Sequence, residues 1–193
     1  MELGLKGKRA IITGASKGIG KAIALTMGGE GANLAVCARG SDSLKETVKD
    51  LESRGMTVYP HTCDVGDKQS LESFLKASYE QLGGVDILIN NTSGFGLTDD
   101  EQGWETGFNV DIMASVRATQ TVVPWMESAG SGNIIHISSI SGLEAGSPPA
   151  YAAVKAALVN HAKTMAQELA PKNIRVNCVA PGSIWVEGGF WNI

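Results

Sequence analysis

A tyrosine and a lysine stand four positions apart in the segment YAAVK, which runs from Tyr151 to Lys155. On a helix this spacing places both side chains on one face, one turn apart. A free tyrosine is a weak acid near neutral pH, but an ammonium group about 4 Å away favours its ionised form by roughly 4 kcal/mol at an effective dielectric constant of about 20. The pair could therefore donate and accept a proton in a reaction. Taken alone the spacing is weak support, because any amphipathic helix can carry these two residues.

A cluster of serines lies shortly before this helix, after a strand-like segment. The sequence IHISSISG places Ser139 twelve residues before Tyr151. A hydroxyl at this position could donate a hydrogen bond to a substrate carbonyl and stabilise the alkoxide that develops there. Serines that follow a strand are also common turn formers, which is the reading that suits Ser141.

A glycine-rich segment, TGASKGIGKA, follows the first apolar run and opens a helical pattern. Gly14 permits a tight turn, Gly18 allows the backbone to approach a phosphate, and Gly20 allows close helix packing. The N-terminus of the helix offers free N–H groups to an anion. A nucleoside triphosphate loop fits less well, because it needs four residues before a Gly-Lys pair that precedes Ser or Thr, whereas here five residues intervene and alanine follows. The segment therefore predicts a site for the pyrophosphate of a dinucleotide.

The end of the second strand-like segment indicates which dinucleotide binds. An acidic residue there typically holds the ribose 2′-hydroxyl of NAD, but the sequence CARGS has Ala38 at this place, followed by Arg39. An arginine suits a 2′-phosphate, and Lys17 adds positive charge beside the same pocket. We therefore expect NADP(H) rather than NAD(H). The alternative for Arg39 is a solvated residue at the strand end.

Short apolar runs rich in β-branched residues alternate with longer helical patterns. The runs are apolar at nearly every position, which predicts strands buried on both faces of a parallel sheet with right-handed crossovers. Ligands of such sheets bind beyond the carboxyl ends of the strands, where the unusual residues cluster. The fold predicted for residues 1–193 is a single doubly wound Rossmann domain with three α/β/α layers. Its strands are expected at 9–14, 33–38, 56–61, 85–90, 132–138 and 174–180, and its helices at 18–29, 42–53, 67–82, 101–128 and 149–170.

The composition is that of a soluble globular protein, with 193 residues, 43% hydrophobic and 19% charged, and a net charge of −4. The acidic balance argues against a nucleic-acid partner. No apolar run approaches the roughly 18 residues of a membrane span, and the N-terminus lacks a signal-like region, so we expect a cytoplasmic protein. Cys37, Cys63 and Cys178 are an odd, widely spaced set, which predicts buried thiols rather than disulfides or a metal site.

Six motifs together resemble the short-chain dehydrogenase/reductase family, in particular its 3-oxoacyl-(acyl-carrier-protein) reductase-like group. They are TGASKGIG, CDV, NNTSG, SSISG, YAAVK and NCVAPG, in the family's order across almost the whole chain. The resemblance implies a nicotinamide-dependent oxidoreductase that acts on a ketone or secondary alcohol, with 3-oxoacyl thioesters as one substrate class. It also implies homodimers or homotetramers that form through the two long helices.

The resemblance implies roles for individual residues. Tyr151 is then the acid/base, Ser139 binds the carbonyl, and Lys155 binds the nicotinamide ribose and promotes ionisation of the tyrosine. Asp111 falls at the family's helix asparagine, which supports a proton-relay water. The expected cofactor contacts are Gly14, Ser16, Lys17, Gly18, Ile19, Gly20, Arg39, Asp64, Val65, Asn91, Tyr151, Lys155, Pro181, Gly182 and Ile184.

The chain departs from the family pattern at four places. NNTSG is one residue longer than the usual Asn-Asn-Ala-Gly, and the serine-to-tyrosine spacing is one residue shorter, which leaves Ser138 as an alternative to Ser139. Asp111 replaces an asparagine, with Asn109 two residues early. Family members also continue past a segment such as PGSIWVEGGFW to a final helix and strand, so the domain is expected to be incomplete. The EGGFW segment is either the start of a mobile lid or a frayed tail.

Two functions of different classes follow from these observations. The first is an NADP(H)-dependent ketone reductase, and the second is a non-catalytic nucleotide-binding or interaction protein on the same fold. Ser139, Tyr151 and Lys155 together favour the enzyme, because a scaffold has no physical need for all three. Candidates for an apolar substrate pocket are Phe95, Trp104, Trp185, Phe190 and Trp191.

Overall fold

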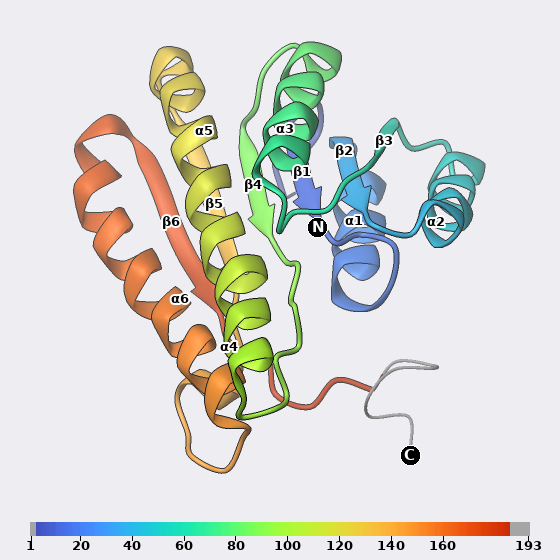
Figure 1. The fold of residues 1–193 in the computed structure, drawn as a ribbon. Coiled ribbons are helices and arrows are strands. Elements are labelled where there is room, and N and C mark those ends of the chain that lie inside the picture. Colours follow the sequence, from blue (N-terminus) through green and yellow to red (C-terminus); the bar gives the residue numbers. More distant parts are fainter. Residues whose placement is uncertain (1–2, 186–193) are drawn as a thin grey trace.

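The computed structural model describes residues 3–185, and within this range six strands form one parallel sheet. The strand order is β3-β2-β1-β4-β5-β6, so the direction of winding reverses between β1 and β4 (Figure 1). This reversal confirms the predicted doubly wound sheet and defines its ligand-binding edge. The strands are β1 (Arg9–Thr13), β2 (Asn33–Ala38), β3 (Val58–Thr62), β4 (Ile87–Asn90), β5 (Gly132–Ile137) and β6 (Ile174–Val179).

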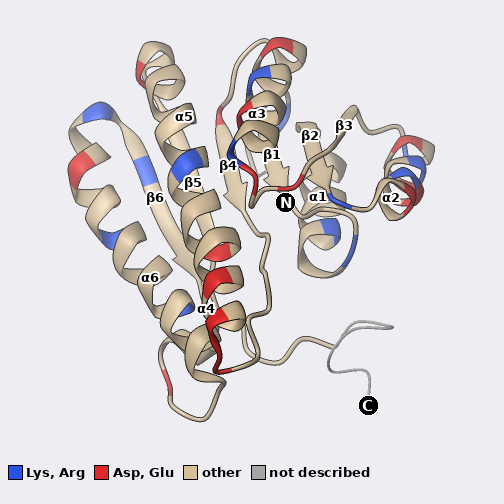
Figure 2. Cartoon of the chain, viewed as in Figure 1, with Lys and Arg blue, Asp and Glu red and all other residues tan. Residues whose placement is uncertain are grey.

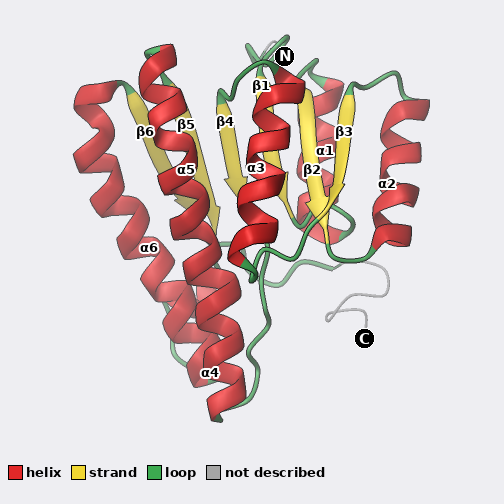
Figure 3. Ribbon diagram, turned by 45° about the horizontal axis from the view of Figure 1, so that its top comes forward, coloured by secondary structure: helices red, strands yellow, loops and turns green. Residues whose placement is uncertain are grey.

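Helices cover both faces of the sheet, which confirms the predicted three layers. On one face lie α1 (Gly18–Gly29) and α2 (Ser41–Ser53), and on the other lie α3 (Lys68–Leu82), α5 (Ala114–Ala129) and α6 (Pro149–Leu169). Figure 3 shows α4 (Glu101–Gly107) and the first turns of α6 extending beyond the carboxyl ends of the strands. Two short 3₁₀ turns, η2 (Ile140–Gly142) and η3 (Ala170–Lys172), complete the described chain.

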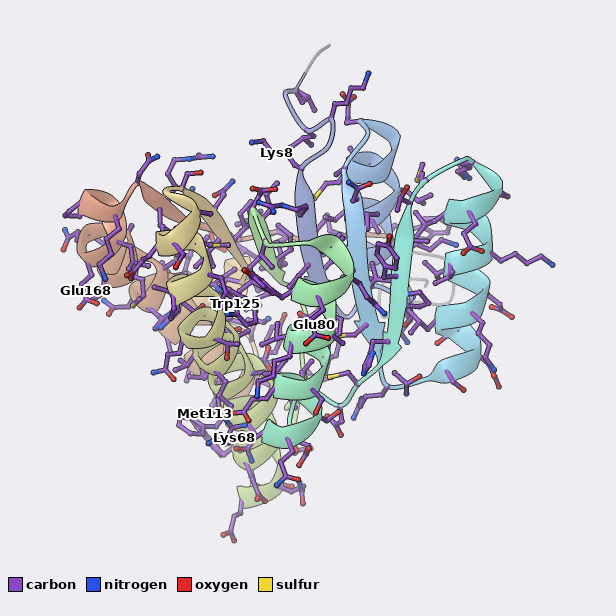
Figure 4. The ribbon with its side chains drawn as sticks, turned by 90° about the horizontal axis from the view of Figure 1, so that it is seen from above. Lys8, Lys68, Glu80, Met113, Trp125 and Glu168 are labelled. Carbon is purple, nitrogen blue, oxygen red and sulfur yellow. The ribbon has the colours of Figure 1, made fainter. Side chains whose placement is uncertain are left out.

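Strand burial follows from the sequence pattern. Ile11 and Leu88 pack toward α3, α5 and α6, whereas Ile12 and Leu34 pack toward α1 and α2. Figure 4 shows side chains filling the space between the layers, with Trp125 of α5 beside α3, where its ring lies 4.7 Å from that of Tyr79. All three cysteines are free thiols, and Cys37 and Cys63 are buried as predicted, whereas Cys178 near the end of β6 is only half-buried.

The single helix predicted over residues 101–128 is wrong in its middle. The structure has α4, then a π-helical turn, η1 (Phe108–Met113), and then α5. A π-helical turn holds an extra residue, so it rotates the side chains that follow relative to a regular helix. Asp111 lies within this turn and is completely buried. The change in helix type therefore accompanies the burial of a charged side chain.

A short chain of polar groups crosses the core on the α6 side. Asn90 Nδ2 lies 3.1 Å from His136 Nδ1, and His136 Nε2 lies 3.2 Å from His161 Nδ1 of α6. Burial, with a smaller contribution from the charge of His161, lowers the pKa of His136 from 6.5 to about 3. His136 is therefore a neutral core residue at physiological pH.

Among residues 3–185, no helix combines the length and the apolar character that crossing a bilayer requires. The same residues hold no group of three or more His, Cys, Asp or Glu side chains placed to bind a metal ion.

Candidate functional site

The predicted site residues gather at the carboxyl edge of the sheet. A predicted site residue stands within two residues of the end of each of the six strands. In chain order these residues are Gly14, Arg39, Asp64, Asn91, Ser139 and Pro181.

The glycines after β1 are required by the backbone path. Gly14 has a φ of +68°, and a Cβ there would lie 2.8 Å from Thr92 Oγ1. A Cβ on Gly20 would overlap the carbonyl oxygen of Gly14. Gly18 has a φ of +55° and open space where its Cβ would stand. Two of the glycines therefore allow close packing, and Gly18 leaves room for a ligand at the start of α1.

The turn that carries these glycines is held by side chains from two neighbouring segments. Asn91 Nδ2 donates to the carbonyl oxygens of Thr13 and Gly14, each at 3.0 Å. Thr47 Oγ1 of α2 donates to the carbonyl of Ser16 at 2.8 Å. Lys17 is the N-cap of α1, and its side chain makes no capping hydrogen bond. The first N–H groups of the helix are thus left for an anion, and this rigid cradle fits a pyrophosphate.

Two cations stand beside this cradle. Lys17 and Arg39 are exposed, and neither forms an ion pair with another residue in the range 3–185. The neighbouring Lys21 is different, because its Nζ lies 3.1 Å from Asp50. After β3, Asp64 is exposed and accepts a hydrogen bond from the Gly66 backbone, while Val65 is buried.

An apolar cleft of about 520 Å³ lies between α1 and the segment after β6. It brings together three predicted cofactor contacts, Ile19, Pro181 and Ile184, with the exposed Trp185 as a further wall. Gly182 is exposed next to this cleft in sequence. The predicted EGGFW lid, with Phe190 and Trp191, lies outside the described residues.

Tyr151 lies in the first turn of α6, and Lys155 follows one turn later. The Lys155 ammonium lies 5.6 Å from the centre of the tyrosine ring. Lys155 is only 2% exposed, and two contacts offset the cost of burying its charge. Its Nζ lies 2.8 Å from Asp111 Oδ1 and donates to the carbonyl of Ile137 at 3.2 Å. The predicted pair therefore shares one helix face, with the lysine charge fixed beneath the tyrosine ring.

Asp111 joins two parts of the site. One carboxylate oxygen pairs with Lys155, and the other accepts a hydrogen bond of 2.9 Å from the Gly94 backbone N–H. Sequence reasoning placed Asp111 here by its match to the family's asparagine, but it did not anticipate the direct ion pair. Only the three-dimensional packing of the π-helical turn against α6 reveals it.

The two candidate serines have different environments. Ser138 Oγ is buried and donates to the carbonyl of Lys155 at 2.7 Å. Ser139 Oγ accepts a hydrogen bond from Ser141 N at 3.2 Å and donates none within the described chain. Ser139 also caps η2. This turn packs so closely on α6 that a Cβ on Gly142 would lie 2.6 Å from Ala156 N. Ser139 thus keeps a free proton beside the helix that carries Tyr151.

The sequence made Phe95 a candidate for the substrate pocket but did not predict where its ring lies relative to Tyr151. Its ring is parallel to that of Tyr151, with an interplanar angle of 4° and ring centres 6.2 Å apart. The signal in the sequence was the extra residue in NNTSG just before this aromatic side chain. Trp104, another pocket candidate, lies exposed on α4 and donates to Asp99 at 3.0 Å.

Known proteins resemble this chain in both sequence and fold. The sequence profile of the family described as short chain dehydrogenase matches residues 8–188. The chain is 37% identical over 189 residues to the 3-oxoacyl-(acyl-carrier-protein) reductase of Thermotoga maritima, covering 93% of this chain and 75% of that protein. It is 36% identical over 187 residues to dehydrogenase/reductase SDR family member 4 of Homo sapiens, covering 93% of this chain and 67% of that protein.

Solved structures agree with the sequence matches. A 7α-hydroxysteroid dehydrogenase in complex with NADH and 7-oxo glycochenodeoxycholic acid superposes with a TM-score of 0.91 at 34% identity, covering 95% of this chain and 74% of the other. The L-sorbose reductase of Gluconobacter frateurii, in complex with NADPH and L-sorbose, gives 0.90 at 37% identity, covering 96% and 73%. On its sequence, its sheet and its site, this chain belongs to the short-chain dehydrogenase family of oxidoreductases.

Proposed function

We propose that this protein transfers a hydride between NADP(H) and a ketone or secondary alcohol within a single nucleotide-binding domain. The observation that carries the proposal is the arrangement of Tyr151 above a buried lysine whose charge Asp111 and Ile137 hold in place. A scaffold protein gains nothing from a charged pair buried beneath a half-exposed phenol, since burying such a pair seldom adds stability.

The glycine cradle and the N-terminus of α1 hold the pyrophosphate of the dinucleotide. Ile19, Pro181 and Ile184 provide an apolar wall for the nicotinamide, and Asp64 and Val65 stand after β3 for the adenine end. When bound, the dinucleotide supplies the hydride for reduction or accepts it in oxidation.

The protein's own residues manage the proton. Ser139 Oγ donates a hydrogen bond to the substrate oxygen and holds it near Tyr151. As the carbonyl carbon gains a hydride, its oxygen becomes an alkoxide and takes the phenolic proton of Tyr151. The Lys155 ammonium stabilises the phenolate that remains, because it is itself buried and lies 5.6 Å from the ring centre. Oxidation follows the same steps in reverse.

The preference for NADP(H) rests on the charges beside the cradle. Ala38 ends β2 where an acid would oppose a 2′-phosphate, and Arg39 and Lys17 are exposed without another described residue as ion-pair partner. An arginine can bind a phosphate with two parallel hydrogen bonds, which a hydroxyl cannot exploit. Homologues in complex with NADH and with NADPH are both known, so these side chains carry the argument.

A screen of neutral ketones, secondary alcohols and 3-oxoacyl thioesters, with NADPH and NADH in parallel, tests the proposal through the absorbance of the reduced cofactor. The thioesters belong in the screen because the Thermotoga maritima relative is a 3-oxoacyl reductase by name. Turnover that is faster with NADPH supports the proposal. Tight NADPH binding without turnover of any compound would favour the non-catalytic alternative. A cytoplasmic location and assembly into dimers or tetramers stay predictions, with light scattering as the test of assembly.

A further inference from the structure

The turn between β4 and α4 presents an aromatic ring in an unfavourable backbone conformation. Phe95 has a φ of +49°, in the left-handed region that side chains with a Cβ avoid. The residue is 58% exposed, so burial of the side chain does not explain why the conformation is kept. Strained residues of this kind concentrate at functional sites, where surrounding contacts hold them.

The neighbouring residues show what holds the turn. A Cβ on Gly94 would lie 2.9 Å from the Thr106 carbonyl oxygen, and a Cβ on Gly96 would overlap the Gly103 carbonyl oxygen. The backbone on both sides of Phe95 is thus pressed against α4. The Gly94 N–H is fixed further by its hydrogen bond to Asp111.

The fixed turn sets Phe95 against the reacting phenol. The two rings are parallel with centres 6.2 Å apart, which lies within the range of offset aromatic pairs. Asp111 also pairs with Lys155, so one buried carboxylate positions both the lysine charge and the turn that carries Phe95. The backbone turn that carries Phe95 is therefore tied through Asp111 to the lysine beneath the phenol.

Charge and polarity around the turn indicate what binds there. The segment 97–107 contains no lysine or arginine, and Figure 2 shows acidic residues along α4. Exposed apolar side chains also follow Ser139, at Ile140 in η2 and at Leu143 just after this turn. Exposed apolar side chains together with an acidic helix favour neutral substrates over anionic ones. The exposed acids are Asp99, Asp100, Glu101 and Glu105.

We propose that Phe95 determines substrate specificity by stacking a flat, neutral ring of the substrate next to Tyr151. This inference rests on the proposed function. It assigns as substrates ketones and secondary alcohols whose carbonyl or carbinol carbon bears an aryl or other flat apolar ring. The ring lies on the exposed part of Phe95 while the substrate oxygen meets Ser139 and Tyr151.

The test compares acetophenone, butan-2-one and the anionic 4-acetylbenzoate as substrates of the wild type, Phe95→Ala and Phe95→Trp. Phe108→Ala is the matched control, because Phe108 is an equally exposed phenylalanine that does not stack on Tyr151. We expect the wild type to prefer acetophenone over both other ketones. In Phe95→Ala, the ratio of kcat/KM for acetophenone to that for butan-2-one should fall roughly tenfold. Phe95→Trp and Phe108→Ala should keep the ratio within about twofold.

A binding measurement separates this inference from the reaction itself. With NADPH bound, 1-phenylethanol cannot be oxidised, so its affinity can be compared with that of butan-2-ol by calorimetry. We expect Phe95→Ala to weaken 1-phenylethanol roughly tenfold and butan-2-ol much less. An unchanged preference in Phe95→Ala, in kcat/KM or in affinity, overturns the role of Phe95. If no ketone is reduced with either dinucleotide, the proposed function fails, and the affinities still decide whether Phe95 selects flat rings.

Discussion

Replacing Asp111 by asparagine and Lys155 by methionine, singly and together, measures how strongly the buried ion pair holds the site. Each single change leaves one charge buried with a single neutral partner. Lys155 keeps the carbonyl of Ile137, and Asp111 keeps the N–H of Gly94. The double variant removes both charges and leaves two side chains of similar size.

The magnitude follows from the separation and the burial of the two groups. At 2.8 Å and an effective dielectric constant of about 20, the attraction is about 6 kcal/mol. Desolvation offsets part of this gain, and removing one partner of a buried pair typically costs about 3–5 kcal/mol. The double variant should therefore cost less than the sum of the singles, with a coupling free energy of about 3 kcal/mol.

Urea unfolding at fixed protein concentration gives the free energy of unfolding for all four proteins. Glu127→Gln and Lys172→Met provide the matched control, because that pair is as close but lies 37% and 48% exposed. Its coupling should stay below about 1 kcal/mol. If Asp111→Asn and Lys155→Met are additive within about 0.5 kcal/mol, the buried pair does not act as a unit and the reasoning is refuted.

Three further predictions follow from the same structure. Because folding lowers the pKa of His136 to about 3, the unfolded chain takes up a proton below pH 6.5 that the folded chain refuses, so stability should fall by up to about 1.4 kcal/mol per pH unit between pH 6.5 and 3. Urea unfolding at several pH values should show this slope reduced in His136→Leu, and parallel profiles would contradict it. Gly20→Ala should destabilise the protein by about 3 kcal/mol or more, because the added methyl clashes with the Gly14 carbonyl. Gly18→Ala should cost only about 1–2 kcal/mol for its positive φ, yet weaken NADPH binding. Equal costs with unchanged binding would count against the cradle. Arg39→Ala should weaken NADPH roughly tenfold or more and NADH less than twofold in fluorescence titrations, and an equal loss for both would remove the basis for NADP(H).

Much of the fold was predictable because its signals are local. Apolar runs such as RAIIT and NLAVCA specify strands buried on both faces, and their alternation with helical patterns specifies a parallel sheet. The functional residues then fall at the strand ends by topology alone. The glycine motif was also predictable, since Gly14 and Gly20 are dictated by a turn with almost no room for a side chain.

The contacts inside the site were not predictable in the same way. The pairing of Asp111 with Lys155 joins residues from two helices, and it depends on a π-helical turn that periodicity does not reveal. The stacking of Phe95 on Tyr151 depends on a turn held by tertiary contacts with α4. The third-strand prediction began at residue 56, but Met56 instead packs its side chain against Gly28 of α1, and the strand begins at Val58.

The central claim is that the phenol of Tyr151 supplies the proton, and Tyr151→Phe tests it most directly. Turnover of a ketone identified in the screen, and the dissociation constant of NADPH, should be measured on the same preparations. Turnover should fall by about two to four orders of magnitude, because a positioned acid is lost, while NADPH affinity stays within about threefold. A Tyr151→Phe variant that reduces the ketone at the wild-type rate would contradict the account.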